Sequence, residues 1–408
     1  MVMRFSNFLD SSPKYTRLLI APDGLKSNVF GLDTEQKLHR STIALDVAQN
    51  NADNYAFAPW LNQEEQIFYK IKEQFGKISD SWLTVAFPAG VCRFIPMTFH
   101  LNRSRPSDKI DEREIQNEVY QILQNARENL RKELLREGGG SFVLVDAIMA
   151  DFKIDGYSVY NPVGLKGATI EARLLAVFSF AEAVNFAQKL AKKLEVNYLH
   201  QTAFAALVAP TISPMLRTDR VGCGIFLRND ATDILLFNSG ALSSVFTISV
   251  GRDIFTHLLA EAFVLPAQEA ERVLVADAQG VLSRSMNTRI RKILTPAMRH
   301  WLSALELIFN ERIYKNNLMP SRMVLSGSVP YPKDIMVNFG LYSQEIKNSR
   351  AVIQPDNLFS SIATKELAEY NLSNLIYPWI VNKVKPQKAI IGPALTLKVF
   401  PVAHPLKS

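Results

Sequence analysis

The spacing of apolar and polar residues predicts a three-strand pattern that occurs twice along the chain. In each copy, three short runs rich in aliphatic residues are separated by turn-forming residues such as Pro22-Asp23-Gly24. The runs of the first copy are Arg17–Ala21, Ser27–Leu32 and His39–Leu45, and those of the second are Gly222–Leu227, Thr232–Phe237 and Leu242–Val250. The copies share topology and not residues, so the pattern indicates an internal duplication of structure.

Between and after the two copies, the apolar spacing indicates helices and further strands. The most regular helix is predicted at Asp111–Glu137, with Asp111 as N-cap, Glu114 three residues later and Gly138–Gly140 at its end. The other predicted helices are Gln63–Phe75, Phe180–Leu194, the segment from Gly251 to Phe263, Pro266–Leu274 and the segment from Thr295-Pro296 to Ile313; the other strands are Trp82–Phe87, Phe142–Asp151, Thr169–Phe178 and Arg322–Leu325. The block Val91–Leu194 therefore reads as a compact α+β unit.

Two duplicated halves that face each other across a cleft are the plan of the actin/Hsp70-type fold. We therefore expect an α/β protein with a duplicated RNase H-like fold. From topology alone, two unrelated α/β domains stay open as the alternative.

Composition narrows the class of protein. Of the 408 residues, 48% are hydrophobic and 21% are charged, as in ordinary globular proteins. No apolar run reaches the roughly eighteen residues of a membrane-spanning helix. Residues 1–14 lack a basic start followed by an apolar stretch, so we expect no signal peptide and a cytoplasmic protein.

The charged, cysteine and histidine residues indicate which ligands the chain is expected to bind. The net charge of +7 favours acidic partners, but it is not gathered in a basic block with aromatic residues, so we expect no nucleic acid. Cys92 and Cys223 are expected to be reduced and buried, and neither they nor the dispersed histidines have metal-ligand spacing.

Three segments resemble the FtsA family of bacterial actin-like cell-division proteins. Residues 154–178, with the run Asn161-Pro162-Val163-Gly164-Leu165-Lys166-Gly167, are similar to the turn before the last strand of the family's inserted 1C (SHS2) subdomain. Residues 232–251 resemble its second phosphate loop and hairpin, and Val324–Ser328 resembles its adenosine loop. The element order agrees from about residue 17 to about residue 382.

The resemblance implies a division of the chain into lobes. Lobe 1A would comprise residues 1–90 and 179–220, the 1C subdomain 91–178, lobe 2A 221–265 and 326–386, lobe 2B 266–325, and a C-terminal tail 387–408.

The second phosphate loop departs from the family pattern D-x-GGGT-x-D. Phe226 stands at the first aspartate, Arg228, Asn229, Asp230 and Ala231 at the glycines and threonine, and only Asp233 is kept. An aromatic residue cannot hold a metal, and side chains at the glycine positions crowd phosphates. Arg228 could contact a phosphate, but an Asn-Asp turn between strands needs no ligand, and we favour the ordinary turn.

The first loop and the later positions show the same departure. The acid of the family's first loop is displaced by one position in this chain, to Asp23. A shift of one residue in a strand turns a side chain to the other face, so Asp23 is expected to point away from the site. Glu271 matches a family residue that faces the ribose, although it also fits a solvated helix position, and the family's following lysine is Leu274. The resemblance thus implies a vestigial nucleotide site at Gly24, Lys26, Arg228, Asn229, Asp230, Thr232, Asp233, Gly251, Glu271, Gly327 and Ser328.

These observations lead to three functional hypotheses. The first is an FtsA-like division scaffold that binds FtsZ-like or other division proteins, self-associates and reaches the membrane through partners. The second is a PilM-like adaptor of a pilus or secretion system that binds a membrane-protein peptide. The third, an active ATPase, is disfavoured by the loop substitutions, and we expect no metal and at most weak ATP with Mg²⁺. Pro393, Pro401 and Pro405 interrupt the tail where the family has an amphipathic helix.

Overall fold

The computed structural model describes residues 15–35, 37–45, 60–61, 63–76, 78, 81–137, 141–159, 162–216, 221–313, 320–326 and 351–353. Several predictions fall elsewhere: Gly327, Ser328, the tail at 387–408 and most of residues 326–386 lie outside the described residues.

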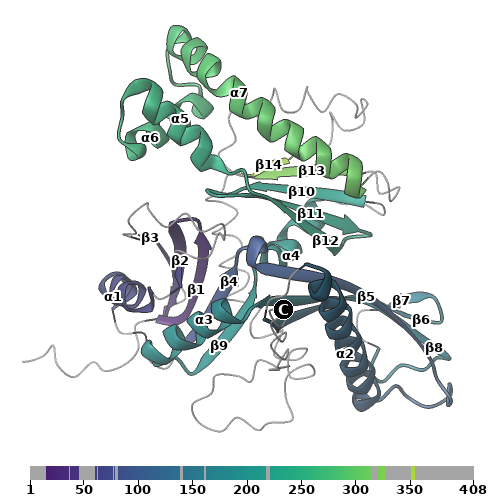
Figure 1. Ribbon diagram of the computed structural model, residues 1–408. Coiled ribbons are helices and arrows are strands. Elements are labelled where there is room, and N and C mark those ends of the chain that lie inside the picture. The colour runs from purple at the N-terminus through teal and green to yellow at the C-terminus, as the bar shows by residue number, and fades with distance from the viewer. Residues whose placement is uncertain are drawn as a thin grey trace, which may run out of the picture.

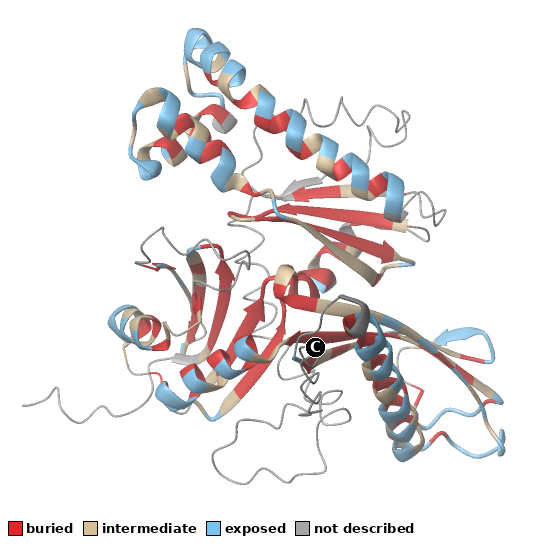
Figure 2. Cartoon of the chain, viewed as in Figure 1, coloured by how far each residue is buried: buried red, intermediate tan, exposed pale blue. Residues whose placement is uncertain are grey.

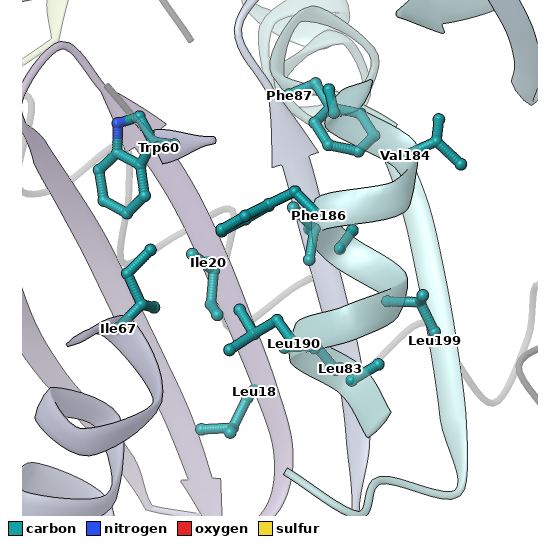
Figure 3. Packing of buried hydrophobic residues seen from close by; sticks show 14 of the residues in the cluster. Leu18, Ile20, Trp60, Ile67, Leu83, Phe87, Val184, Phe186, Leu190 and Leu199 are labelled. Atoms are coloured by element: carbon teal, nitrogen blue, oxygen red, sulfur yellow. The ribbon is translucent and has the colours of Figure 1, made fainter. Parts of the chain in front are cut away.

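The first lobe is built on a five-stranded sheet of order β3-β2-β1-β4-β9 (Figure 1). Its strands are β1 (Tyr15–Asp23), β2 (Lys26–Asp33), β3 (Leu38–Ala44), β4 (Trp82–Phe87) and β9 (Tyr198–Ala203). The first three strands are antiparallel, whereas β4 pairs in parallel with β1 and β9. Helices α1 (Glu64–Phe75) and α3 (Ala181–Lys193) pack on one face, where Leu18 and Ile20 of β1 meet Ile67 and Phe186 (Figure 3).

The second lobe repeats this sheet with the equivalent order β12-β11-β10-β13-β14. Its strands are β10 (Val221–Leu227), β11 (Thr232–Asn238), β12 (Ala241–Ile248), β13 (Pro320–Ser326) and β14 (Ala351–Ile353). Its helices are α5 (Arg252–Phe263), α6 (Ala267–Gln279) and α7 (Arg284–Ile308), which continues into the π-turn Phe309–Ile313. The strand pattern of one antiparallel meander followed by parallel strands confirms the predicted duplication.

Helix α4 (Phe204–Leu216) lies between the two sheets and joins the lobes. One continuous hydrophobic cluster contains Ala205 and Val208 of this helix, Leu19 of β1, and Leu235 and Phe237 of β11. Burial of apolar surface on both sides of α4 therefore connects the two lobes. Figure 2 shows that the sheets are mostly buried and that the helices packed on them have exposed outer faces.

A separate unit is inserted between β4 and α3. It begins at the short 3₁₀ turn Ala89–Val91 and consists of β5 (Cys92–Asn102), α2 (Glu112–Glu137), β6 (Phe142–Ile154), β7 (Tyr157–Val159) and β8 (Thr169–Phe180), with the sheet order β5-β8-β6-β7. This is an α+β unit, as the pattern predicts. That it is the FtsA-type 1C subdomain stays a prediction, as do the lobe boundaries.

Asp111 is the N-cap of helix α2, as predicted, but Glu114 does not complete a capping box. The Asp111 carboxylate accepts a long hydrogen bond of 3.4 Å from the Arg113 N–H. The Glu114 carboxylate does not turn back to the N-cap, because it pairs with Arg103 at 2.8 Å and 3.1 Å.

The predicted start of the last long helix is wrong. Helix α7 begins at Arg284, where the Ser283 hydroxyl caps it by accepting the Met286 N–H, and Pro296 lies inside the helix. The buried positions Ile290, Leu294, Met298 and Trp301 continue the same stripe through the proline. The apolar face therefore outweighs the local effect of Pro296, which had been read as a first-turn residue.

Candidate functional site

Two turns from equivalent places in the two sheets face each other where the first lobe meets the second. One joins β1 to β2, and the other joins β10 to β11 over Arg228–Ala231. Gly24 adopts φ +62° in the first turn, a value that favours glycine. A Cβ at Gly24 would lie 3.5 Å from the Cβ atoms of Asn229 and Asp230, so the turns are in direct contact.

Asp23 and Asn229 form the innermost contact between the lobes. The Asn229 N–H donates to the Asp23 carboxylate at 2.8 Å, and the Asn229 side-chain amide donates to the Asp23 carbonyl at 3.1 Å. The prediction that Asp23 points away from the site is wrong. Leu19 and Ala21 of β1 already face the cluster shared with the second lobe, and the alternation carries Asp23 to that side.

The environment of Asp23 makes its carboxyl group easier to protonate than that of an ordinary aspartate. Burial raises the pKa of this carboxyl to about 6, against the lowering effect of Arg228 and the Asn229 N–H and with a further rise from Asp230. The pKa of Asp253, the second residue of α5, is also raised to about 6, chiefly by burial.

Arg228 is buried and neutralises the carboxylates of its own loop. Its side chain is 5% exposed and forms ion pairs with Asp233 at 2.9 Å and with Asp230 at 3.4 Å. Burial lowers the pKa of Arg228, but the charges of Asp233, Asp230 and Asp23 outweigh burial and raise it above its ordinary value. Asp233 also accepts a hydrogen bond of 2.9 Å from the Thr247 hydroxyl. The guanidinium therefore stays charged inside the lobe and is paired with carboxylates.

The first N–H groups of α5 are bound by the same loop. Arg252 N–H donates to the Arg228 carbonyl and Asp253 N–H to the Asn229 carbonyl, both at 2.8 Å. A Cβ at Gly251 would lie 2.3 Å from the Asn229 carbonyl oxygen, so the loop is packed on the helix start without room for a side chain. These carbonyls satisfy donors that a helix N-terminus otherwise offers to an anion.

A second contact between the lobes lies farther out. Lys26, the first residue of β2, pairs with Glu271 of α6 at 2.7 Å, and Glu271 also pairs with Arg252 at 2.9 Å. Burial raises the pKa of Glu271, but the hydrogen bond from Lys26 and the charges of Arg252 and Lys26 hold it below its ordinary range. Arg252 in turn donates to the Asn229 side-chain oxygen.

The structure gathers most of the predicted site residues and leaves others apart. Thr232 lies in the core of the second lobe, where its hydroxyl donates to the Val250 carbonyl at 2.6 Å and accepts from Trp301 Nε1 at 2.8 Å. Leu274 is also a core residue. Arg252 and Asp253 were missed by the sequence analysis, although their position directly after Gly251 at a predicted helix start is a usable signal.

The arrangement does not fit a magnesium–nucleotide. The charged groups at the facing turns comprise three cations, Lys26, Arg228 and Arg252, and five carboxylates, Asp23, Asp230, Asp233, Asp253 and Glu271. Such an excess of carboxylates repels a polyphosphate that is not neutralised by a metal, and the cations that could replace the metal already have partners. Within the described part of the chain, no group of three or more His, Cys, Asp or Glu side chains is placed to hold a metal ion.

A cavity of about 430 Å³ lies elsewhere on the first lobe, between α1 and α3. Its lining mixes charged side chains such as Glu64 and Lys189, which pair at 3.1 Å, with the ring of Phe186. It shares no residue with the facing turns.

Comparison with known proteins identifies the fold. No protein-family model and no curated protein matches the chain. Among solved structures, the PilM-PilN type IV pilus biogenesis complex matches with a TM-score of 0.52 and 13% identity, over 90% of this chain and 99% of that chain. MreB 5 of Spiroplasma citri bound to AMPPNP matches with a TM-score of 0.46 and 11% identity, over 89% and 98%. The ethanolamine utilization protein EutJ from Carboxydothermus hydrogenoformans gives 0.40 and 12%, over 84% and 85%.

The chain has the actin-like ATPase fold. At this identity the likeness concerns architecture alone, and the lower scores add nothing to the assignment. Among the described helices, none is both long and apolar enough to cross a membrane.

Proposed function

We propose that this protein is an actin-like adaptor that binds other proteins and does not hydrolyse a nucleotide. The observation that carries the proposal is the engagement of the loop and helix N–H groups: those of Asn229, Arg252 and Asp253 donate to Asp23, Arg228 and Asn229. Phosphate binding by this type of fold requires such N–H groups to face the ligand.

Nucleotide binding gives the first test of this proposal. A ligand that binds only the folded state raises its stability, by about 2.7 kcal/mol at a concentration of one hundred times Kd. We expect no saturable increase in melting temperature with MgATP or MgADP. A saturable increase at millimolar nucleotide, absent with magnesium alone, would refute the nucleotide-independent part of the proposal.

The more specific form that we favour is a PilM-like adaptor of a pilus or secretion system, which binds a short cytoplasmic segment of a membrane protein. Its support is the likeness in fold, over 90% of the chain, to a PilM protein in complex with PilN. An adaptor needs shape and surface and no metal chemistry, which agrees with the paired charges at the facing turns.

An FtsA-like division scaffold is the second candidate, favoured by the turn at residues 161–167. In the described part of this turn, Gly164 has φ +81° and its N–H donates to the Ile110 carbonyl at 3.0 Å. A Cβ at Gly167 would lie 2.2 Å from Ile154, so close packing requires glycine there. These contacts explain the residue types by the packing of the insert, and they support a shared insert more than a shared partner.

Fluorescence anisotropy with labelled peptides separates the two candidates. We expect micromolar binding of a cytoplasmic peptide of a PilN protein and none of an FtsZ C-terminal peptide, with scrambled peptides as controls. The reverse result would favour the division scaffold. Binding of neither peptide would count against both assignments.

A further inference from the structure

The facing turns connect the lobes through five residues, Asp23, Lys26, Asn229, Arg252 and Glu271, which we call the clasp. Its inner part is the pair of hydrogen bonds between Asp23 and Asn229, which are both buried. Hydrogen bonds to a buried carboxylate are stronger than those between neutral groups.

The outer part of the clasp is the ion pair of Lys26 with Glu271. It joins β2 of the first lobe to α6 of the second, 245 residues later in the chain. Arg252 links the outer part to the inner part, because it contacts both Glu271 and the Asn229 side chain. The five residues thus form one connected network and not two separate contacts.

The clasp adds a polar connection next to the hydrophobic one through α4, since Ala21 and Phe226 of that cluster lie two and three residues before Asp23 and Asn229. That helix joins the sheets by apolar contacts from Leu19 on one side and Leu235 on the other. An apolar joint permits small rotations, whereas a directional polar network at a second place removes them. The apolar and the polar connection together therefore restrict the relative orientation of the lobes.

We propose that the clasp replaces the bound nucleotide as the link between the lobes, and that it holds the two lobes in one relative orientation without any ligand. Lys26 and Arg252 meet the Glu271 carboxylate instead of phosphate oxygens, and the Asp23 carboxylate accepts the loop N–H group. The clasp rests on the proposed function, in which the protein works without a nucleotide. A partner protein would then meet a surface whose shape is already fixed by the clasp.

Electron spin resonance distances between the lobes test the clasp. Spin labels on Tyr69→Cys in α1 of the first lobe and Val264→Cys between α5 and α6 of the second report on the two lobes, and both positions are exposed, at 64% and 90%. Cys92 and Cys223 are buried and burial raises the pKa of both thiols, so they react slowly with the label. We expect a single narrow distance distribution that MgATP does not change.

The variant Asp23→Ala/Glu271→Gln removes the carboxylate of the inner part and the negative charge of the outer part, and leaves the hydrogen bond from the Asn229 amide to the main-chain carbonyl of residue 23. We expect a broader distribution with a longer mean distance. Glu269→Gln is the matched control, because Glu269 lies on the same helix but pairs with Arg272 three residues along. An unchanged distribution in the double variant would overturn the proposal. If circular dichroism shows that the double variant is unfolded, Glu271→Gln and Lys26→Met are measured singly, and unchanged distributions in both would overturn it.

The outcomes are separable from those of the proposed function. Peptide binding with unchanged distances in the clasp variants would refute the clasp and leave the adaptor proposal standing. Broadened distances in the clasp variants without binding of either peptide to the parent protein would support the clasp and count against the adaptor proposal. A change of the parent distances on addition of MgATP would refute the nucleotide-independent link.

Discussion

The two facing turns occupy equivalent places in the duplicated sheets, yet they have become chemical opposites. The β1–β2 turn is short, depends on Gly24 and offers acceptors: the Asp23 carboxylate and carbonyl. The β10–β11 turn is longer, encloses the charge of Arg228 and offers the N–H and amide donors of Asn229. In an actin-type ATPase both turns donate to the same anion. Here the β10–β11 turn donates and the β1–β2 turn accepts, so the two turns bind each other.

The largest expected effect concerns the charge enclosed by the second turn. Arg228→Met leaves Asp233 and Asp230 buried without their cation, so we expect a loss of about 3–5 kcal/mol in the free energy of unfolding, measured with urea. Arg272→Met, which removes an exposed pair, should cost less than about 1 kcal/mol. Recovery is expected in Arg228→Met/Asp233→Asn, and equal losses for the buried and exposed arginines would contradict the distinction.

The next effect compares a glycine in contact with each turn. Gly251→Ala inserts a Cβ 2.3 Å from the Asn229 carbonyl oxygen, and overpacking of this kind costs about 1–3 kcal/mol or more. Gly24→Ala has ordinary space at 3.5 Å and carries only the penalty of φ +62°, about 1–2 kcal/mol. Urea titration should rank Gly251→Ala as the more harmful, and it should also lengthen the distance between the turns. The opposite ranking would show that the second loop can yield.

The third prediction uses the protonation of Asp23. Its pKa is about 6 in the folded protein against 3.8 for an ordinary aspartate, so the folded state binds the proton more tightly. Stability from this group is full below pH 3.8 and is lost as the pH rises through about 6. Relative to Asp23→Asn, the unfolding free energy of the parent protein should therefore fall between pH 4 and pH 7, by up to about 3 kcal/mol at about 1.4 kcal/mol per pKa unit. Asp253 is present in both proteins, so its own titration cancels, and a difference that does not vary with pH would show that Asp23 is not buried as described.

The smallest effect belongs to the outer part of the clasp. The Lys26 side chain is 43% exposed, so Lys26→Met should lower the unfolding free energy by less than about 1 kcal/mol, and less still in high salt. Its influence should instead be seen in the distance between the lobes. A loss above about 2 kcal/mol would mean that the pair is shielded from water more than its exposure indicates.

The duplicated meander and the start of α5 could be predicted because their signals are local. Strands β10 and β11 are short runs rich in aliphatic residues with turn-forming residues between them, and Gly251 precedes an amphipathic segment. No element was predicted over β9 and α4, since Pro210 and Pro214 interrupt the helical spacing of a segment that is buried on both sides. The short strand β7 was also missed.

The site was predictable in its residues more than in its contacts. Loss of the glycines and of the first aspartate is visible in the sequence, but the choice of partner is not. Lys26 and Glu271 are 245 residues apart, and only the approach of the two lobes shows that they meet. Asp23 illustrates the same limit, because it shares a face of β1 with Leu19 and Ala21, and only the approach of the second lobe shows that this face meets Asn229.

Each turn rests on a buried tryptophan from elsewhere in its own half. Trp60 Nε1 donates to the Gly24 carbonyl at 2.7 Å, and Trp301 Nε1 donates to the Thr232 hydroxyl at 2.8 Å, directly after the second turn. The halves therefore carry separate intrinsic fluorophores. The Trp60 indole is hydrogen-bonded to the backbone of the first turn, and the Trp301 indole to the side chain of the residue that follows the second turn. Variants that keep one indole at a time would let the emission of each half be followed on its own, without an added dye.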